Sequence, residues 1–229
     1  MARLKNGLSG PMVGKLGNHV GYVRLGQALV RMKSSGTEKK KRTPAQKAAS
    51  NAFSVVSKFI TPINVFLNVS FKQYVVGTGQ IPRNAGMSFN SAAVYGEYPD
   101  QQFDYSKGIV AVGNLPLAEN PVAELFEYDE PNFKAVLKFN WDVNPLWEDC
   151  LKRDQVMLLA FFPETGHADW SLSGARRNEG ADLLQINPKI GLKSGRFEAH
   201  FVETYMAFIS DDRMNISNSI YCGRINLTA

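Results

Sequence analysis

The residues with the clearest potential for chemistry are the lysines and arginines in the N-terminal part of the chain. Residues 1–96 carry fourteen Lys and Arg but a single acid, Glu38, whereas residues 97–229 carry twelve Lys and Arg and twenty Asp and Glu. The overall charge of +5 therefore hides a basic part of +13 and an acidic part of −8. Such cations bind phosphates or acidic protein surfaces, and a charge asymmetry of this size predicts an interaction surface.

Eight cations and one tyrosine lie close together near the N-terminus and form the candidate interaction site. Glycines separate the first of them, and glycine permits close approach of the backbone to another chain or to a phosphate. Lysine and arginine neutralise phosphates, and an exposed tyrosine ring stacks on a base. The candidate residues, for contacts in an assembly or with nucleic acid, are Lys15, Tyr22, Arg24, Arg31, Lys33, Lys39, Lys40, Lys41 and Arg42.

Residues 10–16 have an arrangement of glycine and lysine close to that of a phosphate-binding loop. The nucleotide-binding motif needs four residues between its glycines and a Ser or Thr after the lysine, which ligates Mg²⁺. Here three residues separate Gly10 from Gly14, and Leu16 follows Lys15. The stretch therefore does not predict nucleotide binding.

The three histidines are the remaining candidates for catalysis or metal binding. They are His19, His167 and His200, and no Cys-x-x-Cys or His-x-x-x-His spacing accompanies them. Glu164 and Asp169 flank His167, but this pattern favours a polar hairpin loop over a metal site. No serine stands in a Gly-x-Ser-x-Gly elbow. We therefore predict no enzyme activity, cofactor, metal or small-molecule substrate.

The composition is that of a globular chain with a sizeable core. The 229 residues are 44% apolar and 21% charged, and no apolar run is long enough to span a membrane. A positive N-terminus without an apolar segment after it predicts no conventional signal peptide. Cys150 and Cys222 are too few for a disulfide framework, so we expect free thiols. These features predict a protein that is cytoplasmic or assembled into a particle.

The basic stretch divides into a leader, two β-prone runs and a linker. Residues 1–12 contain two glycines and a proline and predict a flexible leader. Residues 19–24 and 27–32 predict the two strands of a hairpin, with its turn at Leu25-Gly26. Residues 34–42 are polar and cationic, which predicts an extended linker.

Helical signals follow the linker. Thr43 is a natural N-cap, Pro44 suits the first helical position, and Gln46 completes a capping box. Pro62 ends or kinks this helix, a second helical stripe runs from residue 63 to 74, and residues 84–95 predict a third short helix. The apolar residues expected to pack these helices, either on the sandwich or on a partner, are Phe53, Val56, Phe59, Phe66 and Phe71.

After Pro99 the pattern changes to that of a β domain. Residues 156–162 are continuously apolar, as expected of a central strand that is covered on both sides. Trp141 is a predicted core residue, and Tyr205 or Tyr221 a predicted corner tyrosine. Strands of this number and spacing favour an immunoglobulin- or fibronectin-III-like sandwich. The predicted strands are 104–112, 122–128, 132–141, 155–162, 168–176, 182–187, 197–209 and 217–227.

Several motifs, taken in order, resemble one protein family. They are Gly14-Lys-Leu-Gly-Asn-His-Val-Gly-Tyr22, Val30-Arg-Met-Lys33, Arg42-Thr-Pro-Ala-Gln-Lys-Ala48, Asp104-Tyr-Ser-Lys-Gly-Ile-Val110 and Ser217-Asn-Ser-Ile-Tyr-Cys-Gly-Arg-Ile225. Together they resemble an uncharacterised family found mainly in Bacteroidota, number 6266 among the domains of unknown function, whose members open with a Gly-Lys-Val-Gly-Asn-Val-Val-Gly-type motif. The resemblance spans nearly the whole chain and implies no activity.

A looser similarity involves phage virion proteins, in which Arg-Thr-Pro-Ala-Gln-Gln-Ala leads into a helix. The matching residues here are the third motif, which begins at Arg42. This is the pattern of a capped helix, and it carries little information about function.

The sequence thus predicts an α+β chain in three parts. Residues 1–42 form a basic glycine-rich arm or hairpin with a linker, residues 43–96 a region of two to three helices, and residues 97–229 an acidic antiparallel β-sandwich. The opposite charges favour a non-enzymatic structural protein, a homo-oligomer that assembles head to tail into a ring, a filament or a virion-like particle. Nucleic-acid binding by the same basic residues is the alternative, and a solvated basic face on a monomer is the third interpretation.

Overall fold

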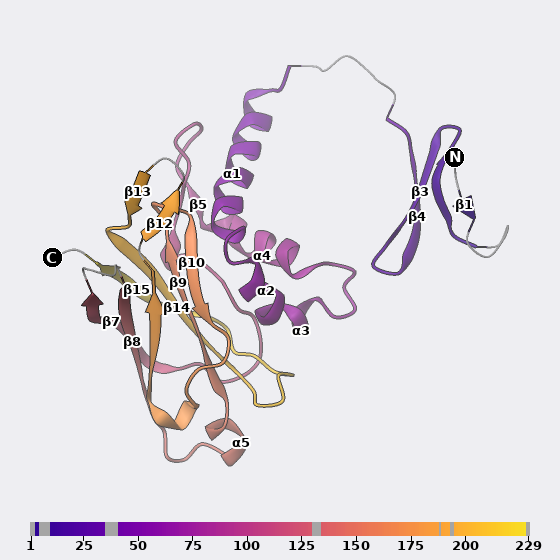
Figure 1. Cartoon of the computed structure of the whole chain (residues 1–229). Coiled ribbons are helices and arrows are strands. Elements are labelled where there is room, and N and C mark those ends of the chain that lie inside the picture. The colour runs from indigo at the N-terminus through magenta and orange to yellow at the C-terminus, as the bar shows by residue number, and fades with distance from the viewer. Residues whose placement is uncertain are drawn as a thin grey trace. The chain divides into compact units, whose positions relative to one another are not determined.

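The chain forms two compact units, Met1–Thr43 and Pro44–Ala229, and each is described by itself. The computed structural model describes residues 3–4, 10–34, 41–129, 134–187, 189–192 and 195–227. Figure 1 labels the helices and strands of both units. The model is α+β, with several antiparallel sheets and few helices.

The N-terminal unit is an antiparallel sheet in the order β1-β2-β3-β4. Its strands are β1 (Arg3–Leu4), β2 (Met12–Leu16), β3 (His19–Arg24) and β4 (Gln27–Met32). The two predicted strands and the turn between them are confirmed. The prediction of a flexible leader is wrong for Arg3, Leu4 and Met12. These residues form strand pairs between β1 and β2, although glycines and a proline lie between the two strands.

The first helix of the second unit begins at Pro44, the first helical position that the capping signals predict. The helices are α1 (Pro44–Ile60), α2 (Asn64–Ser70), α3 (Lys72–Val75), α4 (Pro82–Asn90) and the short 3₁₀ helix η2 (Ser91–Ala93). Pro62 lies in the break between α1 and α2, as predicted, because proline lacks the backbone N–H that would continue α1. Among the described residues no single helix is long and apolar enough to cross a membrane. Helices α1 and α2 together have the length and composition of a membrane span, but an 82° bend separates them.

The remaining elements are short strands with few helical turns. They are β5 (Val94–Tyr95), β6 (Gln102–Phe103), η3 (Tyr105–Lys107), β7 (Glu119–Asp129), β8 (Lys134–Asp142), α5 (Asp149–Lys152), β9 (Gln155–Phe162), β10 (His167–Ser171), η4 (Arg177–Glu179), β11 (Ala181–Ile186), β12 (Lys189–Leu192), β13 (Gly195–Glu198), β14 (Phe201–Ile209) and β15 (Ile220–Asn226). The predicted strand 197–209 is thus divided between β13 and β14, and β14 contains a register shift at Thr204/Tyr205.

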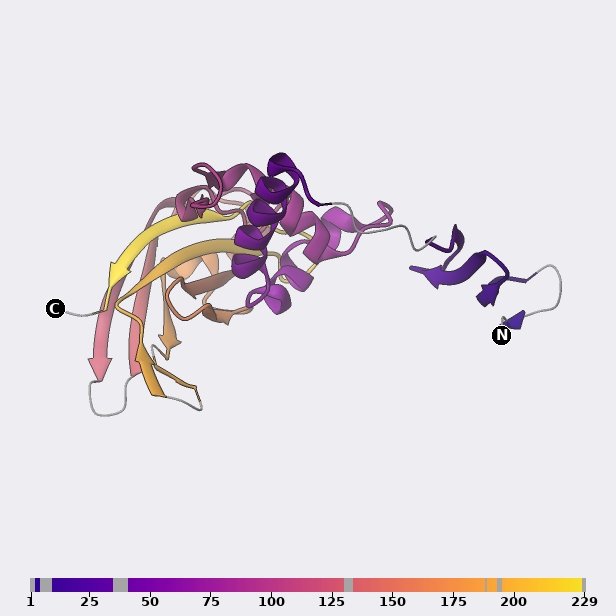
Figure 2. The ribbon, with the colours of Figure 1, turned by 90° about the horizontal axis from the view of Figure 1, so that it is seen from above.

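Two sheets share one apolar core. The four-stranded sheet has the order β10-β9-β14-β15, and the three-stranded sheet has the order β11-β8-β7. The side chains between them come mainly from alternate positions of β8, β9 and β14, including Leu137, Phe139, Leu158, Phe162 and Phe208. The other side of the four-stranded sheet packs on the helices, and Figures 1 and 2 show the helices gathered on that side.

Strand β9 joins the two cores, because its alternate side chains point to opposite sides. Val156, Leu158, Ala160 and Phe162 belong to the core between the sheets. Met157, Leu159 and Phe161 belong to the core beneath the helices. The continuously apolar run is therefore confirmed as a central strand that is covered on both sides.

The predicted strand 104–112 is wrong. Asp104 accepts a hydrogen bond from the Ser106 backbone N–H at 3.1 Å and thereby caps the 3₁₀ turn η3. Beyond the turn the backbone is held by side chains instead of a strand, since Asn90 Oδ1 accepts from Ile109 N at 2.8 Å and Ser219 Oγ accepts from Val110 N at 3.0 Å.

Two aromatic predictions have different outcomes. Trp141 is confirmed as a core residue, and its indole N–H donates to the Arg177 carbonyl at 2.7 Å. The corner tyrosine is wrong, because such a residue bonds to backbone a few residues upstream. Tyr205 instead donates to the carbonyl of Tyr105, one hundred residues earlier, and Tyr221 donates to the Glu203 carboxylate.

We expect Phe59→Ala to lower the free energy of unfolding by about 3–5 kcal/mol, because the ring is 1% exposed in the core beneath the helices. Its ring centroid lies 4.7 Å from that of Phe103 and 5.0 Å from that of Phe161. Phe53→Ala on the same helix is the matched control and should be near neutral, since Phe53 is 63% exposed and does not pack in the core of this chain. Denaturant unfolding of both variants measures the difference, and a loss below about 1 kcal/mol for Phe59→Ala would contradict burial of this helix face.

Candidate interaction surface

The register of the N-terminal sheet places cations and apolar side chains together on one side. Residues directly opposite each other in an antiparallel pair point to the same side. Val20 lies opposite both Lys15 and Arg31, and Tyr22 lies opposite Leu29. Arg24 and Gln27 form the next pair on this side. We call this surface the basic face: Lys15, Val20, Tyr22, Arg24, Gln27, Leu29 and Arg31.

The hairpin turn fixes this arrangement. Leu25 has a φ of 49° and Gly26 a φ of 80°. Two successive residues with positive φ are typical of the two-residue turn whose twist matches that of the flanking strands. Because the turn sets the pairing of Arg24 with Gln27, it also determines which side chains share the basic face.

The other candidate cations lie at the border of this sheet or beyond it. The Lys33 backbone N–H donates to the Asn18 carbonyl at 2.6 Å, directly after β4. Lys41 and Arg42 are exposed and precede α1, whereas Lys39 and Lys40 lie outside the described residues. The structure thus brings Lys15, Tyr22, Arg24 and Arg31 together, and a binding role for the nine residues stays a prediction.

The opposite side of the sheet is apolar and exposed. His19 lies opposite Leu16 and Met32, Val23 lies opposite Ala28, and Val30 lies opposite Gly21. The exposed fractions are 63% for Leu16, 60% for Val30 and 72% for Met32. Sequence reasoning missed this apolar side, although Ala28, Val30 and Met32 alternate with Gln27, Leu29 and Arg31 along β4.

The N-terminal unit has almost no interior. Within residues 10–34, Gly21 is the one buried residue, and every side chain of β4 is exposed. A small sheet needs a second layer to be stable in water, because its apolar side chains otherwise remain hydrated. The apolar side chains of this unit therefore remain in contact with water.

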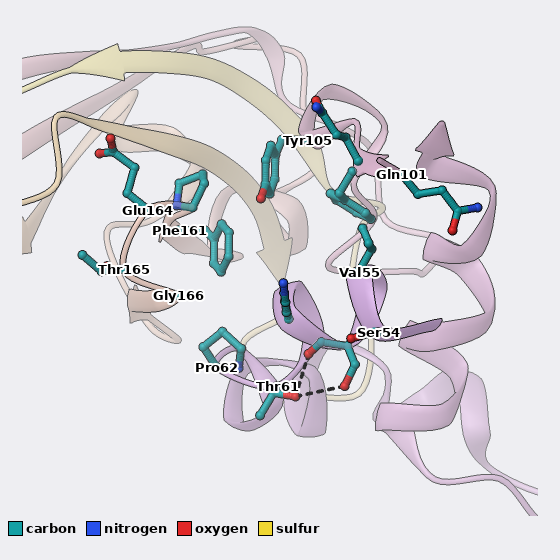
Figure 3. A pocket seen from close by; sticks show the side chains of 15 residues that line it. Ser54, Val55, Thr61, Pro62, Gln101, Tyr105, Phe161, Glu164, Thr165 and Gly166 are labelled. Atoms are coloured by element: carbon teal, nitrogen blue, oxygen red, sulfur yellow. Dashed lines mark hydrogen bonds between the residues drawn. The ribbon is translucent and has the colours of Figure 1, made fainter. Parts of the chain in front are cut away.

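An open groove of about 890 Å³ in the second unit was the strongest alternative site. Figure 3 shows its lining from α1, the segment before η3 and the turn between β9 and β10. Its polar groups mostly bind the protein itself: Thr61 Oγ1 donates to the Ser57 carbonyl at 2.6 Å, and Glu164 accepts from the His200 backbone N–H at 2.6 Å. The groove therefore presents few groups that are free to bind a ligand.

Two of the three histidines pair with carboxylates. His167 Nε2 lies 3.1 Å from Asp169, while His200 Nδ1 lies 3.1 Å from Glu164. Glu164, His167 and Asp169 therefore do not converge on one point. In the described part of the chain, no group of three His, Cys, Asp or Glu side chains is placed to hold a metal ion.

Among the described residues, two ion pairs contain a buried carboxylate, and in both the carboxylate is paired with an arginine of the same chain. Arg177 Nη2 lies 3.2 Å from Asp154 and donates to the Pro116 carbonyl at 3.0 Å. Burial raises the pKa of Asp154 and lowers the pKa of Arg177, because the loss of water around each charge outweighs their attraction. The second pair joins Glu203 to Arg224 at 2.7 Å.

The comparisons with known proteins place the chain in a family. The family model described as a family of unknown function (DUF6266) matches residues 11–223, and the chain therefore belongs to this family. No curated protein and no solved structure matches the chain.

Gly21→Val should unfold the N-terminal sheet without affecting the second unit. A side chain at residue 21 would collide with the Met12 carbonyl oxygen, which covers Gly21. Overpacking of this kind costs about 1–3 kcal/mol, and each 1.4 kcal/mol raises the rate of amide hydrogen exchange about tenfold. Hydrogen exchange of the whole chain, read by mass spectrometry, should therefore lose protection in β2 to β4.

The matched control for this experiment is Val23→Thr, because Val23 is exposed on the same strand. It should leave the exchange of β2 to β4 unchanged. Equal protection in the Gly21→Val variant and the wild type would contradict the packing of Met12 on β3.

Proposed function

We propose that the protein is a non-enzymatic structural protein that self-assembles through its basic N-terminal unit. The assembly is a head-to-tail ring or filament, or part of a virion-like particle. The observation that carries the proposal is the N-terminal sheet, with cations on one side, exposed apolar residues on the other and a single buried residue within 10–34. Such a unit gains stability by contacting a partner.

The distribution of charge favours a second copy of the chain as that partner. Residues 1–43 carry ten Lys and Arg and one Glu, whereas residues 44–229 carry sixteen Lys and Arg and twenty Asp and Glu. Opposite charges on two parts of one chain attract head to tail, and contacts of this heterologous kind generate rings or filaments.

We further infer that the body of the protein is an immunoglobulin- or fibronectin-III-like sandwich. In chain order, β7, β8, β9, β10, β11, β14 and β15 are lettered A, B, C, C′, E, F and G. The two sheets then read E-B-A and C′-C-F-G, which is the immunoglobulin arrangement without strand D. In this proposal the sandwich is a rigid body that carries the contact surfaces.

Nucleic-acid binding is the second candidate function, favoured by one observation. Tyr22 is partly exposed on the basic face, next to the pair formed by Arg24 and Gln27 and on the same side as Lys15 and Arg31. Cations beside an accessible ring are typical of surfaces that bind single strands. The acidic excess of residues 44–229 argues against it, since it repels the same ligand.

Self-assembly predicts that the wild-type protein has a mass larger than the 25.4 kDa of one chain in light scattering. Combined Lys15→Glu, Arg24→Glu and Arg31→Glu should raise the concentration needed for assembly at least about tenfold, because like charges then face each other across the contact. Added salt should weaken the wild-type assembly by screening.

The control is Lys47→Glu, Lys58→Glu and Lys72→Glu, which changes the net charge equally at exposed positions of the second unit. It should assemble as the wild type does. A wild-type protein that stays monomeric at high concentration would refute the proposal.

Nucleic-acid binding predicts that the protein retains single-stranded DNA or RNA at low salt and loses it steeply as salt rises. Tyr22→Ala should then weaken binding by about 1–3 kcal/mol per stacked base, whereas Tyr22→Phe keeps the ring and should retain affinity. Filter binding across a salt series measures both. Absence of retention at low salt would rule out this function.

A further inference from the structure

The two outer sides of the paired sheets differ in what covers them. The helices pack on the outer side of the four-stranded sheet. On the outer side of the three-stranded sheet, by contrast, Val122, Glu124 and Glu127 of β7 are exposed, and so is Leu183 of β11. This second side is therefore an exposed sheet surface.

Acidic side chains gather on that surface along β7. Glu119 lies opposite Asp142, Glu124 opposite Lys138, and Glu127 opposite Val136, so all six point away from the core. Glu119, Glu124 and Glu127 form no ion pair with any described residue. The nearest polar contact of Glu124 is with Asn140 Nδ2 at 3.2 Å. We call this surface the acidic face: Glu119, Val122, Glu124, Glu127, Asp142 and Leu183, with Lys138 between Glu124 and Leu183 on the same side.

Exposed apolar residues lie among these acids. Val122 is 55% exposed, Leu183 51%, and Phe126, at the register shift of β7, 58%. Protein interfaces combine apolar residues with a polar rim, and these residues of β7 and β11 give the surface a mixed composition of this kind.

We propose that the acidic face receives the basic face of the N-terminal unit of a second copy of the chain. The inference rests on the proposed self-assembly and names the surface that it uses. Both surfaces are sides of twisted sheets, which pack face to face about 10 Å apart. Glu119, Glu124 and Glu127 equal in number the three cations of the basic face and carry the opposite charge. In the proposed contact, Val122 and Leu183 face the apolar residues of the basic face, Tyr22 and Leu29.

The position of β7 favours a second copy over the chain's own N-terminal unit. The linker leads into Pro44 at the start of α1, in the helical layer. Strand β7 belongs to the sheet on the far side of the four-stranded sheet, and Figures 1 and 2 show it well apart from the start of α1. The start of α1 and strand β7 therefore lie on opposite sides of the four-stranded sheet.

The test is a charge exchange between the two faces in the full chain, read by sedimentation velocity. The first variant carries Glu119→Lys, Glu124→Lys and Glu127→Lys. The second carries Lys15→Glu, Arg24→Glu and Arg31→Glu, and the third combines all six changes. The first two should each need at least about tenfold higher concentration to assemble, and the third should assemble as the wild type does, because attraction is restored with the signs reversed.

Glu97→Lys, Asp100→Lys and Asp211→Lys form the matched control, since all three acids are exposed elsewhere on the same unit. Unchanged assembly of this control supports the inference. Loss of assembly in the control, or failure of the six-fold variant to recover, would overturn it.

Two outcomes separate this inference from the proposed function. If the wild type assembles and the β7 variant assembles equally well, the acidic face is not the receiver, while self-assembly stands. If the wild type is monomeric, both proposals fail. Thermal unfolding is the control for folding. Each variant should unfold at the same midpoint temperature as the wild type, because the substituted residues are exposed.

Discussion

Burial of β9 and β14 on both sides is the constraint on which the second unit depends. Their side chains alternate between a core shared with the three-stranded sheet and a core shared with the helices. Phe59 of α1 reaches into the second core and lies beside Phe161 of β9 and Tyr205 of β14. The helices and the two sheets are therefore one packed body, in which removing any layer leaves an apolar sheet surface in water.

The N-terminal sheet has the same kind of strands without the second layer. Its backbone groups pair across the ladder, but Leu16, Val30 and Met32 stay exposed. A sheet with satisfied hydrogen bonds and unsatisfied apolar area gains most from contact with another surface. The cations lie on the opposite side of the sheet, where their charge favours an acidic surface.

Local signals in the sequence predict the elements whose causes are local. The turn at Leu25-Gly26 requires two positive φ values, Pro44 marks the start of α1, and residues 156–162 are apolar at every position; each is confirmed by the structure. The family could also be recognised from its ordered motifs, and the family model confirms it.

The failures come from interactions between residues far apart in the chain. The segment around Val110 looks like a strand, yet Asn90 and Ser219 bind its backbone in place of a neighbouring strand. Tyr205 likewise bonds to a residue one hundred positions away.

Surfaces were even harder to predict. The nine candidate residues follow from composition, whereas their division between one face of a sheet and a linker depends on register. The acidic face on β7 also requires the pairing with β8, because a shift of one residue would point Glu124 into the core.

The central claim is that the chain assembles with copies of itself, and electron microscopy of the native wild-type protein tests it most directly. We expect closed rings or filaments in which one 25.4 kDa chain repeats along a head-to-tail path. Single particles the size of one chain, seen even at high protein concentration, would contradict it.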